Sequence, residues 1–392
     1  MSSASGEPLT QYRHQDITLA LRQRIVGGAL GAGSRLPIRA QLQQMFDASP
    51  TTVQRAMDTL KRQGFVESRG KRGTFVVDQP PHLARYGLVL PYRPSTEKPW
   101  EKIFSALVNQ ATAISRAGQR RIVAYYASSA ASEGDDLRRL RDDLAAQRIA
   151  GLFFASNPAP LLKLPLLANR YVPMVALLHA FEHEAVEAVE AVWVNRRAFF
   201  TRAFDHLAAQ GCRRVAIIAS QFIVTREIPH FEQFLQTELS SRGMESRPYW
   251  LQYASPDEAI GAANIVRLLM REGQPDRPDG LVIADDNVAH HAASGLAASG
   301  VKCGGDQADL HVVAHCNYPD VTPSAIPMAR IGFSAADIMA TALDALEKQR
   351  DGRVPQHVHL VPPLTEAEFA ANREGHIIHP DNSIAYHPPH EG

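Results

Sequence analysis

The sequence predicts an α/β protein with a small helical N-terminal segment and a large segment built on parallel sheets. Three observations support this prediction. Residues 12–77 contain three stretches of helical apolar spacing, followed by two short strand-like runs around a glycine-bearing turn. After residue 85, nearly continuous apolar runs alternate with helical patterns, as is typical of strands buried on both faces of a sheet. The alternation starts again near residue 192, which predicts two α/β halves in tandem.

The composition is that of a folded globular chain. Of the 392 residues, 45% are hydrophobic and 21% are charged, which excludes a disordered protein. No apolar run approaches the roughly 18–20 residues needed to cross a bilayer, and the N-terminus lacks the apolar core of a secretory signal. We therefore expect a cytoplasmic protein without a membrane partner. The three cysteines are too widely spaced for a disulfide framework or a zinc site, so we expect reduced thiols.

The charge is unevenly distributed although the chain is neutral overall. Residues 1–79 contain eleven Lys and Arg against six Asp and Glu, an excess of five positive charges. The remaining residues carry an equal negative excess. A basic segment joined to an acidic one indicates an anionic partner for the basic segment only.

Three helices are predicted in the basic segment. The first spans Tyr12 to Gly28 and has an apolar residue at every fourth position. A short second helix follows Leu36-Pro37 and carries Leu42, Met45 and Phe46 on one side. The third helix runs to about Gln63, with Ser49 as its N-cap and Pro50 at its first position.

Two strands complete this segment. They cover residues 65–68 and 74–77 and are joined by a hairpin, Arg69-Gly70-Lys71-Arg72-Gly73, that holds three basic residues. Three helices followed by a basic hairpin make up a winged helix-turn-helix. Such a domain can place its third helix in the major groove of DNA while the wing contacts phosphates or the minor groove. The alternative is a three-helix interaction module with a solvent-exposed hairpin.

The segment resembles the GntR-type DNA-binding domain in four blocks of the same order and spacing. The blocks are residues 36–42, 49–57, 64–66 and 70–76. The resemblance implies base contacts by residues at the start of the third helix and by one residue near the second helix. The DNA-binding residues predicted from pattern and resemblance are Arg39, Ser49, Pro50, Thr51, Thr52, Gln54, Arg55, Lys71 and Arg72. Related domains have Arg in place of Ala40, Pro50 and Gln54, and Gln54 favours adenine where Arg favours guanine.

The large segment is predicted to contain alternating strands and helices. The expected strands are residues 86–91, 121–126, 151–155, 172–177, 192–194, 215–219, 249–253, 280–284 and 310–314. The expected helices are residues 100–118, 135–148, 196–210, 230–242, 256–272 and 287–299. Two such halves predict a bilobed, doubly wound domain whose ligand binds beyond the carboxyl ends of the strands.

This segment resembles the LacI-type effector domain, which shares its fold with type I periplasmic sugar-binding proteins. The matching blocks are residues 86–91, 149–154, 194–218 and 278–287. A GntR-type head on a LacI-type body is the architecture of arabinose-type repressors. The resemblance therefore implies residues 1–77 as the DNA-binding domain, 78–85 as a linker, and 86–392 as the effector-binding and dimerisation domain.

In the resembling family, the effector is held by residues that directly follow strands. By position these are Tyr92, Arg93, Asn157, Phe222, Asp286, His315 and Asn317. Arg226 lies near the place of the family's effector-clamping arginine, before the second-lobe helix. A carboxylate such as Asp286 can accept hydrogen bonds from sugar hydroxyls, and an aromatic ring can stack on a pyranose. The implied function is a transcription regulator, expected to be a repressor, that binds a palindromic operator as a homodimer and responds to a sugar-like effector.

Other classes of function have weaker support in the sequence. The adjacent His290 and His291 point about 100° apart on a helix, which is unsuited to shared metal binding. The histidines between His376 and His390 lie among prolines. No phosphate loop, metalloprotease helix or nucleophile elbow is present in the sequence. We therefore expect no metal, no cofactor and no enzymatic activity. The alternatives are a large domain that serves as a ligand-independent dimerisation scaffold, and an enzyme fused to a DNA-binding head.

Overall fold

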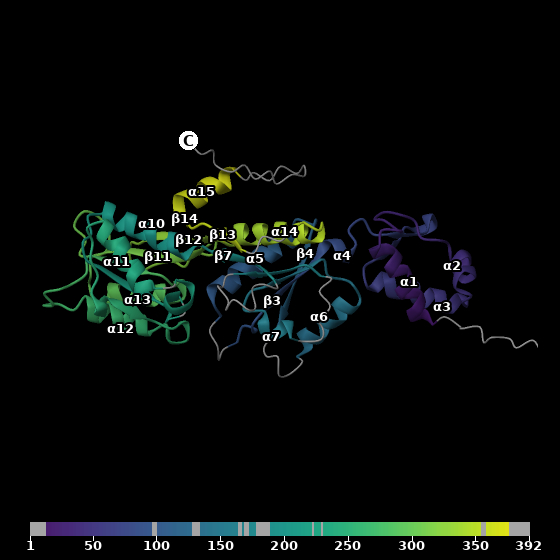
Figure 1. Cartoon of the computed structure of the whole chain (residues 1–392), viewed down its shortest axis with the longest axis horizontal. Helices are drawn as coiled ribbons and strands as arrows, with labels where there is room; N and C mark the ends of the chain where they lie inside the picture. Colours follow the sequence, from purple (N-terminus) through teal and green to yellow (C-terminus); the bar gives the residue numbers. More distant parts are fainter. Residues whose placement is uncertain are drawn as a thin grey trace, which may run out of the picture. The chain divides into compact units, whose positions relative to one another are not determined.

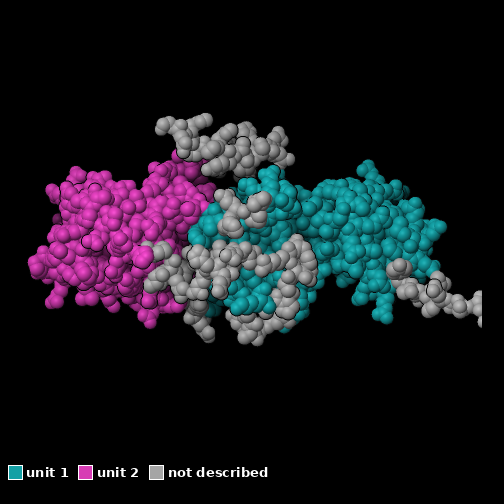
Figure 2. All heavy atoms as spheres, viewed as in Figure 1, with its two compact units in different colours: residues 1–100, 107–193, 338–359 teal, residues 101–106, 194–337, 360–392 magenta. Residues whose placement is uncertain are grey.

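The structure is a computed structural model, shown in Figure 1. It describes residues 13–375 apart from 96–99, 128–133, 164–166, 168–171, 178–188, 222, 229 and 354–357. The chain divides into two compact units, coloured separately in Figure 2. Unit 1 comprises residues 1–100, 107–193 and 338–359, and unit 2 comprises 101–106, 194–337 and 360–392.

The N-terminal segment of unit 1 is a winged helix-turn-helix, as predicted. It consists of helices α1 (His14–Val26), α2 (Arg39–Phe46) and α3 (Pro50–Arg62), followed by the antiparallel strands β1 (Val66–Ser68) and β2 (Thr74–Val76). One apolar core joins all five elements, and it includes Ile17, Leu21, Leu42, Val53, Leu60, Phe65 and Val76.

Local sequence determines where α3 begins and ends. The Ser49 hydroxyl accepts a hydrogen bond from the Thr52 backbone N–H at 3.2 Å, and Pro50 occupies the first helical position, as predicted. Gly64 then follows with φ +80°, a conformation that favours glycine. Of the three residues placed on one side of α2, Met45 is 50% exposed. On the eight-residue α2 only Leu42 and Phe46, one turn apart, face the core.

The first sheet has six strands in the order β13-β7-β6-β5-β3-β4. Their bounds are β3 (Arg85–Leu90), β4 (Arg121–Tyr126), β5 (Gly151–Phe154), β6 (Met174–Leu177), β7 (Glu190–Val194) and β13 (Val358–Val361). The strand pairs from β4 through β7 are parallel. The accompanying helices are α4 (Pro81–Ala84), α5 (Lys102–Arg116), α6 (Asp135–Ala145), α7 (Ala159–Leu162) and α14 (Ala335–Arg350).

Helices pack on both faces of this sheet. Leu140 and Leu144 of α6 share a core with Leu152 and Phe154 of β5. On the opposite face, a Cβ placed on Gly151 would lie 2.8 Å from the Leu346 side chain of α14. The sheet is therefore buried on both sides, as the continuous apolar runs predicted.

The second sheet also has six strands, in the order β14-β12-β11-β10-β8-β9. Their bounds are β8 (Val215–Ala219), β9 (Leu251–Tyr253), β10 (Gly280–Ile283), β11 (His311–Tyr318), β12 (Ala329–Ser334) and β14 (Leu364–Thr365). All pairs are parallel except that of β12 with β14. The helices of this part are α10 (Arg196–Ala209), α11 (Phe231–Ser241), α12 (Gly261–Leu269), α13 (Asp286–Ala298) and α15 (Glu366–Gly375).

The two halves are not arranged strictly in tandem, so that expectation was wrong. Strand β7, expected to begin the second half, pairs with β6 in the first sheet. The chain also returns to unit 1 after β12 and before β14 of the second sheet, because residues 338–359, which hold most of α14 and the start of β13, belong to unit 1. Several elements are shorter than expected: for example, residues 248–250 form a 3₁₀ turn before β9, and residues 256–258 form another before α12.

Candidate functional site

The outer face of α3 carries several of the side chains predicted to contact DNA. Val53, Ala56 and Leu60 are fully buried on the inner face. Thr51 and Arg55 are exposed on the opposite side, and Thr52 and Gln54 are partly exposed. Within the described chain, the Arg55 side chain has no hydrogen-bond or ion-pair partner, so its full donor set is available to a ligand.

Gln54 is held by a neighbour that was not predicted from the sequence. Its Nε2 donates a hydrogen bond of 2.7 Å to Oδ1 of Asp58, one turn later on α3. The Oε1 of Gln54 is buried and has no hydrogen-bond partner among the described residues. A buried amide oxygen without a donor is unfavourable, and an adenine N6 amino group would supply one once the side chain turns outward.

Of the three basic residues of the wing, Arg69 is engaged in contacts within the domain. Arg69 contacts Glu67 at 2.6 Å and Asp78 at 3.2 Å, and its guanidinium lies 4.9 Å from the centre of the Phe75 ring. Lys71 and Arg72 lie on the exposed 3₁₀ turn at the tip and form no ion pair with any described residue. The wing therefore offers two uncompensated positive charges, while Arg69 stabilises its base.

The remaining predicted DNA contacts are also accessible. Arg39 is exposed at the first position of α2, and Ser49 and Pro50 are exposed at the start of α3. All nine predicted residues thus lie on α2, on the α3 N-terminus and outer face, or on the wing. The elements that carry them share the apolar core described above.

In unit 1, Tyr92 and Arg93 follow β3 at the carboxyl edge of the first sheet. Leu90 of β3 is the register partner of Tyr126 of β4, so both strands end at this edge. The guanidinium of Arg93 lies 4.8 Å from the centre of the Tyr126 ring. Trp100 contacts both tyrosines, with ring centres 6.2 Å from Tyr126 and 5.6 Å from Tyr92.

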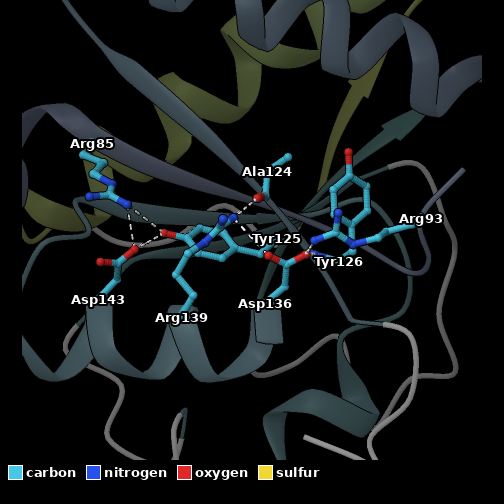
Figure 3. Close-up of polar contacts among 8 residues, drawn as sticks. All are labelled: Arg85, Arg93, Ala124, Tyr125, Tyr126, Asp136, Arg139 and Asp143. Atoms are coloured by element: carbon cyan, nitrogen blue, oxygen red, sulfur yellow. Dashed lines mark hydrogen bonds and ion pairs between the residues drawn. The ribbon is translucent and has the colours of Figure 1, made fainter. Parts of the chain in front are cut away.

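Arg93 is also ion-paired with Asp136 of α6, a carboxylate that is only 5% exposed (Figure 3). Arg139 approaches the other oxygen of Asp136 at 3.1 Å. Asp136 was not predicted from the sequence. A signal was present, since Asp136 lies four residues before Leu140 and therefore on the apolar face of α6.

A second buried carboxylate on α6, Asp143, is surrounded by donors. Arg85 approaches it at 2.7 Å, Arg148 forms an ion pair with it, and the Tyr125 hydroxyl hydrogen-bonds to it. Burial, followed by the hydrogen bond to Asp143, raises the pKa of Tyr125 to about 12. Figure 3 shows the two carboxylates projecting from α6 toward β3 and β4. Asp136 anchors this helix at the carboxyl end of β3, beside Arg93, whereas Asp143 pairs with Arg85 at the start of β3.

Asn157 has a local structural role. It follows β5, and its Oδ1 accepts a hydrogen bond of 2.9 Å from the backbone N–H of Ala159 at the start of α7. The side-chain oxygen of Asn157, a residue predicted to bind the effector, therefore already accepts a hydrogen bond within its own turn.

In unit 2, the structure brings Asp286, His315 and Asn317 together at the carboxyl edge of the second sheet. Asn317 Nδ2 donates a hydrogen bond of 2.7 Å to Oδ2 of Asp286, and His315 Nδ1 lies 3.7 Å from its Oδ1. All three residues are at most 5% exposed. Burial raises the pKa of Asp286, but His315, Lys102 and Asn317 outweigh it and hold that pKa below its ordinary value.

His315 is enclosed by aromatic rings. The centres of the Phe199 and Phe333 rings each lie 5.6 Å from the imidazole centre, and neither imidazole nitrogen has a hydrogen-bond partner among the described residues. Burial and the nearby charge of Arg196 lower the pKa of His315.

Two further residues of unit 2 complete this cluster. Asp285 is the N-cap of α13, where its Oδ1 accepts hydrogen bonds from the backbone and side-chain N–H groups of Asn287 at 2.9 and 2.8 Å. Lys102 donates from Nζ to the Asp286 carbonyl at 2.6 Å, and burial lowers its pKa. Lys102 was not predicted from the sequence, because its contacts join positions about 185 residues apart.

The other two predicted effector residues are less fully described. Phe222 lies outside the described residues. The backbone of Arg226 belongs to a π-helical turn (Ile223–Glu227), and its side chain lies outside the described part. Nearby, Arg196 pairs with Glu227 at 2.9 Å and lies 5.4 Å from the centre of the Phe333 ring.

Comparison with known families identifies two domains. Residues 13–76 match the family described as "Bacterial regulatory proteins, gntR family", and residues 204–368 match the "Periplasmic binding protein-like domain". Over 70 residues the chain is 40% identical to a protein named as the HTH-type transcriptional regulator RmpR of Mycobacterium gastri. That match spans 17% of this chain and 26% of the relative, so the chain covers about a quarter of the curated relative's length.

Solved structures share the fold of the large segment. A LacI-family regulatory protein from Chloroflexus aggregans matches with a TM-score of 0.53 at 16% identity, covering 71% of this chain and 96% of that one. A LacI-family transcriptional regulator from Bifidobacterium animalis subsp. lactis gives 0.52 at 18% identity, with 73% and 96% covered. The lactose repressor bound to the anti-inducer ONPF gives 0.51 at 16% identity, with 71% and 97% covered.

Two kinds of feature are absent from the described residues. No helix in this part is both long and apolar enough to span a membrane. No group of three or more His, Cys, Asp or Glu side chains in the same part could hold a metal ion.

Proposed function

Because this chain joins a gntR-type helix-turn-helix domain to a periplasmic-binding-protein-like domain, we propose that it is a sequence-specific DNA-binding transcription regulator controlled by a small effector. The observation that carries the proposal is the exposed polar face of α3 beside an uncompensated basic wing. Gln54 and Arg55 suit base edges, and Lys71 and Arg72 suit phosphates.

The operator is bound by a homodimer. A single winged domain offers few base contacts, whereas two domains related by a twofold axis read a palindrome with the combined specificity of both. We further propose that the protein acts as a repressor and that the large segment, residues 86–392, supplies the dimer contacts.

The effector binds at the carboxyl edge of a parallel sheet, where α/β folds place their ligands. Aromatic residues such as Tyr92 and the polar side chains of the Asp286 cluster support a sugar or sugar derivative. The lactose repressor, one of the structural neighbours, is itself named for a sugar, which agrees with this proposal. A ligand alters DNA affinity only as far as it prefers one conformation of the protein.

In the alternative, a ligand-independent dimerisation scaffold, the polar side chains at the strand ends would have a purely structural role. Asp286 and Asn317 are hydrogen-bonded to each other, and Asn157 is used in its own turn.

Selection from a random library of DNA duplexes tests DNA binding, and operator titration in the presence of effectors tests regulation. We expect one enriched palindromic motif, bound about 10³-fold or more tightly than random DNA. At least one small molecule should change this affinity. A scaffold would retain the motif and respond to no small molecule, and a protein that enriches no motif contradicts the proposal.

A further inference from the structure

The arginine at the end of β3 has an unusual environment for a surface residue. The Arg93 side chain is 64% exposed, yet its Nη2 is fixed by the nearly buried Asp136 and its plane is held near the Tyr126 ring. A long side chain usually loses much conformational freedom when it binds a ligand. Here Asp136 and Tyr126 have already restricted that freedom.

The local charge balance leaves Arg93 able to bind an anion. Asp136 faces two guanidinium groups, those of Arg93 and Arg139, so the cluster of three has a net positive charge. Arg139 is committed to the fold, since it also donates to the Ala124 carbonyl at 2.7 Å and lies 4.9 Å from the centre of the Tyr125 ring. The excess charge therefore resides on Arg93, whose other N–H groups have no partner among the described residues.

Aromatic rings lie beside this charge. Tyr92, Trp100 and Tyr126 are all half-buried and form a continuous series of ring contacts that ends at the guanidinium of Arg93. Aromatic rings at a strand end bind flat ligand faces, and a guanidinium binds carboxylates and phosphates through paired N–H donors. The two features together select a ligand that has both an anionic group and a ring.

We propose that Arg93, with Tyr92, Trp100 and Tyr126, binds an anionic ring compound through its carboxylate or phosphate, and that Asp136 is the positioning residue for Arg93. The inference rests on the proposed function, because it names the chemical class of the effector. It specifies a sugar acid, a sugar phosphate or an aromatic acid in place of an unspecified sugar or sugar derivative.

The test is a thermal-unfolding screen of the full chain against matched pairs at constant ionic strength. The pairs are glucuronate and glucose, glucose 6-phosphate and glucose, and 4-hydroxybenzoate and phenol. Binding to the native state raises Tm, so an anionic member should raise it where its neutral counterpart does not. The three pairs separate carboxylate from phosphate and sugar from aromatic ring.

Two variants make the screen specific. R93Q should weaken binding of the stabilising anion by about tenfold or more, the effect expected for hydrogen bonds to a charged group. R247Q is the matched control, because Arg247 also pairs with carboxylates and lies 5.9 Å from the centre of an aromatic ring, that of Trp250. It should bind the anion as the unmodified protein does.

D136N distinguishes positioning from simple charge. The variant removes the Asp136 carboxylate that holds Arg93 but keeps the Arg93 guanidinium. The affinity for the anion should therefore fall, although the local positive charge rises. If D136N fails to fold, the comparison of R93Q with R247Q still tests whether Arg93 binds the anion.

The inference is overturned if neutral members stabilise as well as anions, if R93Q retains full anion binding, or if no anion in the panel stabilises the protein. Operator binding without ligand is measured on the same variants and should be unchanged. Failure of the unmodified protein to bind an operator would count against the proposed function instead.

Discussion

The side-chain amide of Gln54 donates a hydrogen bond of 2.7 Å to the carboxylate of Asp58, one turn later on the outer face of α3. The carboxylate thus restricts the side chain that we propose reads a base. This pair connects the local geometry of the helix to the sequence preference of the whole protein, and it gives the first prediction.

Exchanging Gln54 should change which base is preferred rather than whether DNA is bound. In Q54R, adenine should be replaced by guanine at one position of each half-site, since Arg pairs with guanine O6 and N7. The discrimination is about 1–3 kcal/mol for each such pairing. D58A should keep adenine but tolerate other bases at that position. Selection from random duplexes measures both, and an unchanged motif in Q54R would show that Gln54 does not read the base.

Neutralising the wing should weaken binding to all sequences alike. K71Q with R72Q removes the two uncompensated charges of the tip, so the slope of log affinity against log salt should fall by about one for each phosphate that the wing no longer neutralises. K61Q with R62Q is the charge-matched control, because Lys61 and Arg62 lie at the opposite end of α3. Equal salt slopes in the wing variant and the unmodified protein would mean that the wing does not touch DNA.

Removing a buried carboxylate of α6 should destabilise the protein strongly. D143N leaves Arg85 and Arg148 without their partner at a position that is 1% exposed, and breaking such a pair costs about 3–5 kcal/mol. D142N changes the neighbouring residue, which is 69% exposed, and should cost about 0–1 kcal/mol. Chemical denaturation measures both free energies of unfolding. Similar values for the two variants would contradict the role assigned to Asp143.

Acidification should destabilise the protein partly through His315. Burial holds the folded-state pKa of this histidine below the ordinary value of about 6.5, so below that pH the unfolded state binds a proton that the folded state does not. Its stabilising contribution is therefore complete above about pH 6.5 and disappears as pH falls through the folded-state pKa.

The variant H315Q isolates this effect. The pKa values of His82 and His206 are lowered by burial as well, so the unmodified protein alone cannot assign the pH dependence to one residue. The free energy of unfolding should fall less steeply between pH 7 and pH 5 in H315Q than in the unmodified protein. Parallel pH profiles would show that His315 does not titrate in this range.

Much of the fold followed from local sequence signals. Ser49-Pro50 and Gly64 correctly predicted both ends of α3, because capping depends on neighbouring residues alone. Apolar runs such as residues 215–219 correctly predicted the buried parallel strands. The return of the chain to unit 1 was missed, since the pairing of β13 with β7 joins segments about 160 residues apart.

The candidate sites also contain residues that local sequence predicted and residues that only tertiary packing brings together. Exposed residues of α3 and the wing could be predicted, because an amphipathic helix determines its own outer face. The partners that fix Arg93 and Asp286 could not, since Asp136 and Lys102 reach them through tertiary packing. Asp136 had a recognisable signal on the apolar face of its helix, whereas Lys102 had none.

DNA recognition by α3 is tested most sharply by selection from random DNA duplexes with the purified full-length chain, repeated with the R55Q variant. Arg55 lies exposed on the outer face of α3 and has no partner within the described chain. We predict one palindromic motif for the unmodified protein, and a weakened or absent motif in R55Q while the protein remains folded. A full-length chain that enriches no motif, or an R55Q variant that enriches the same motif with the same affinity, would contradict this prediction.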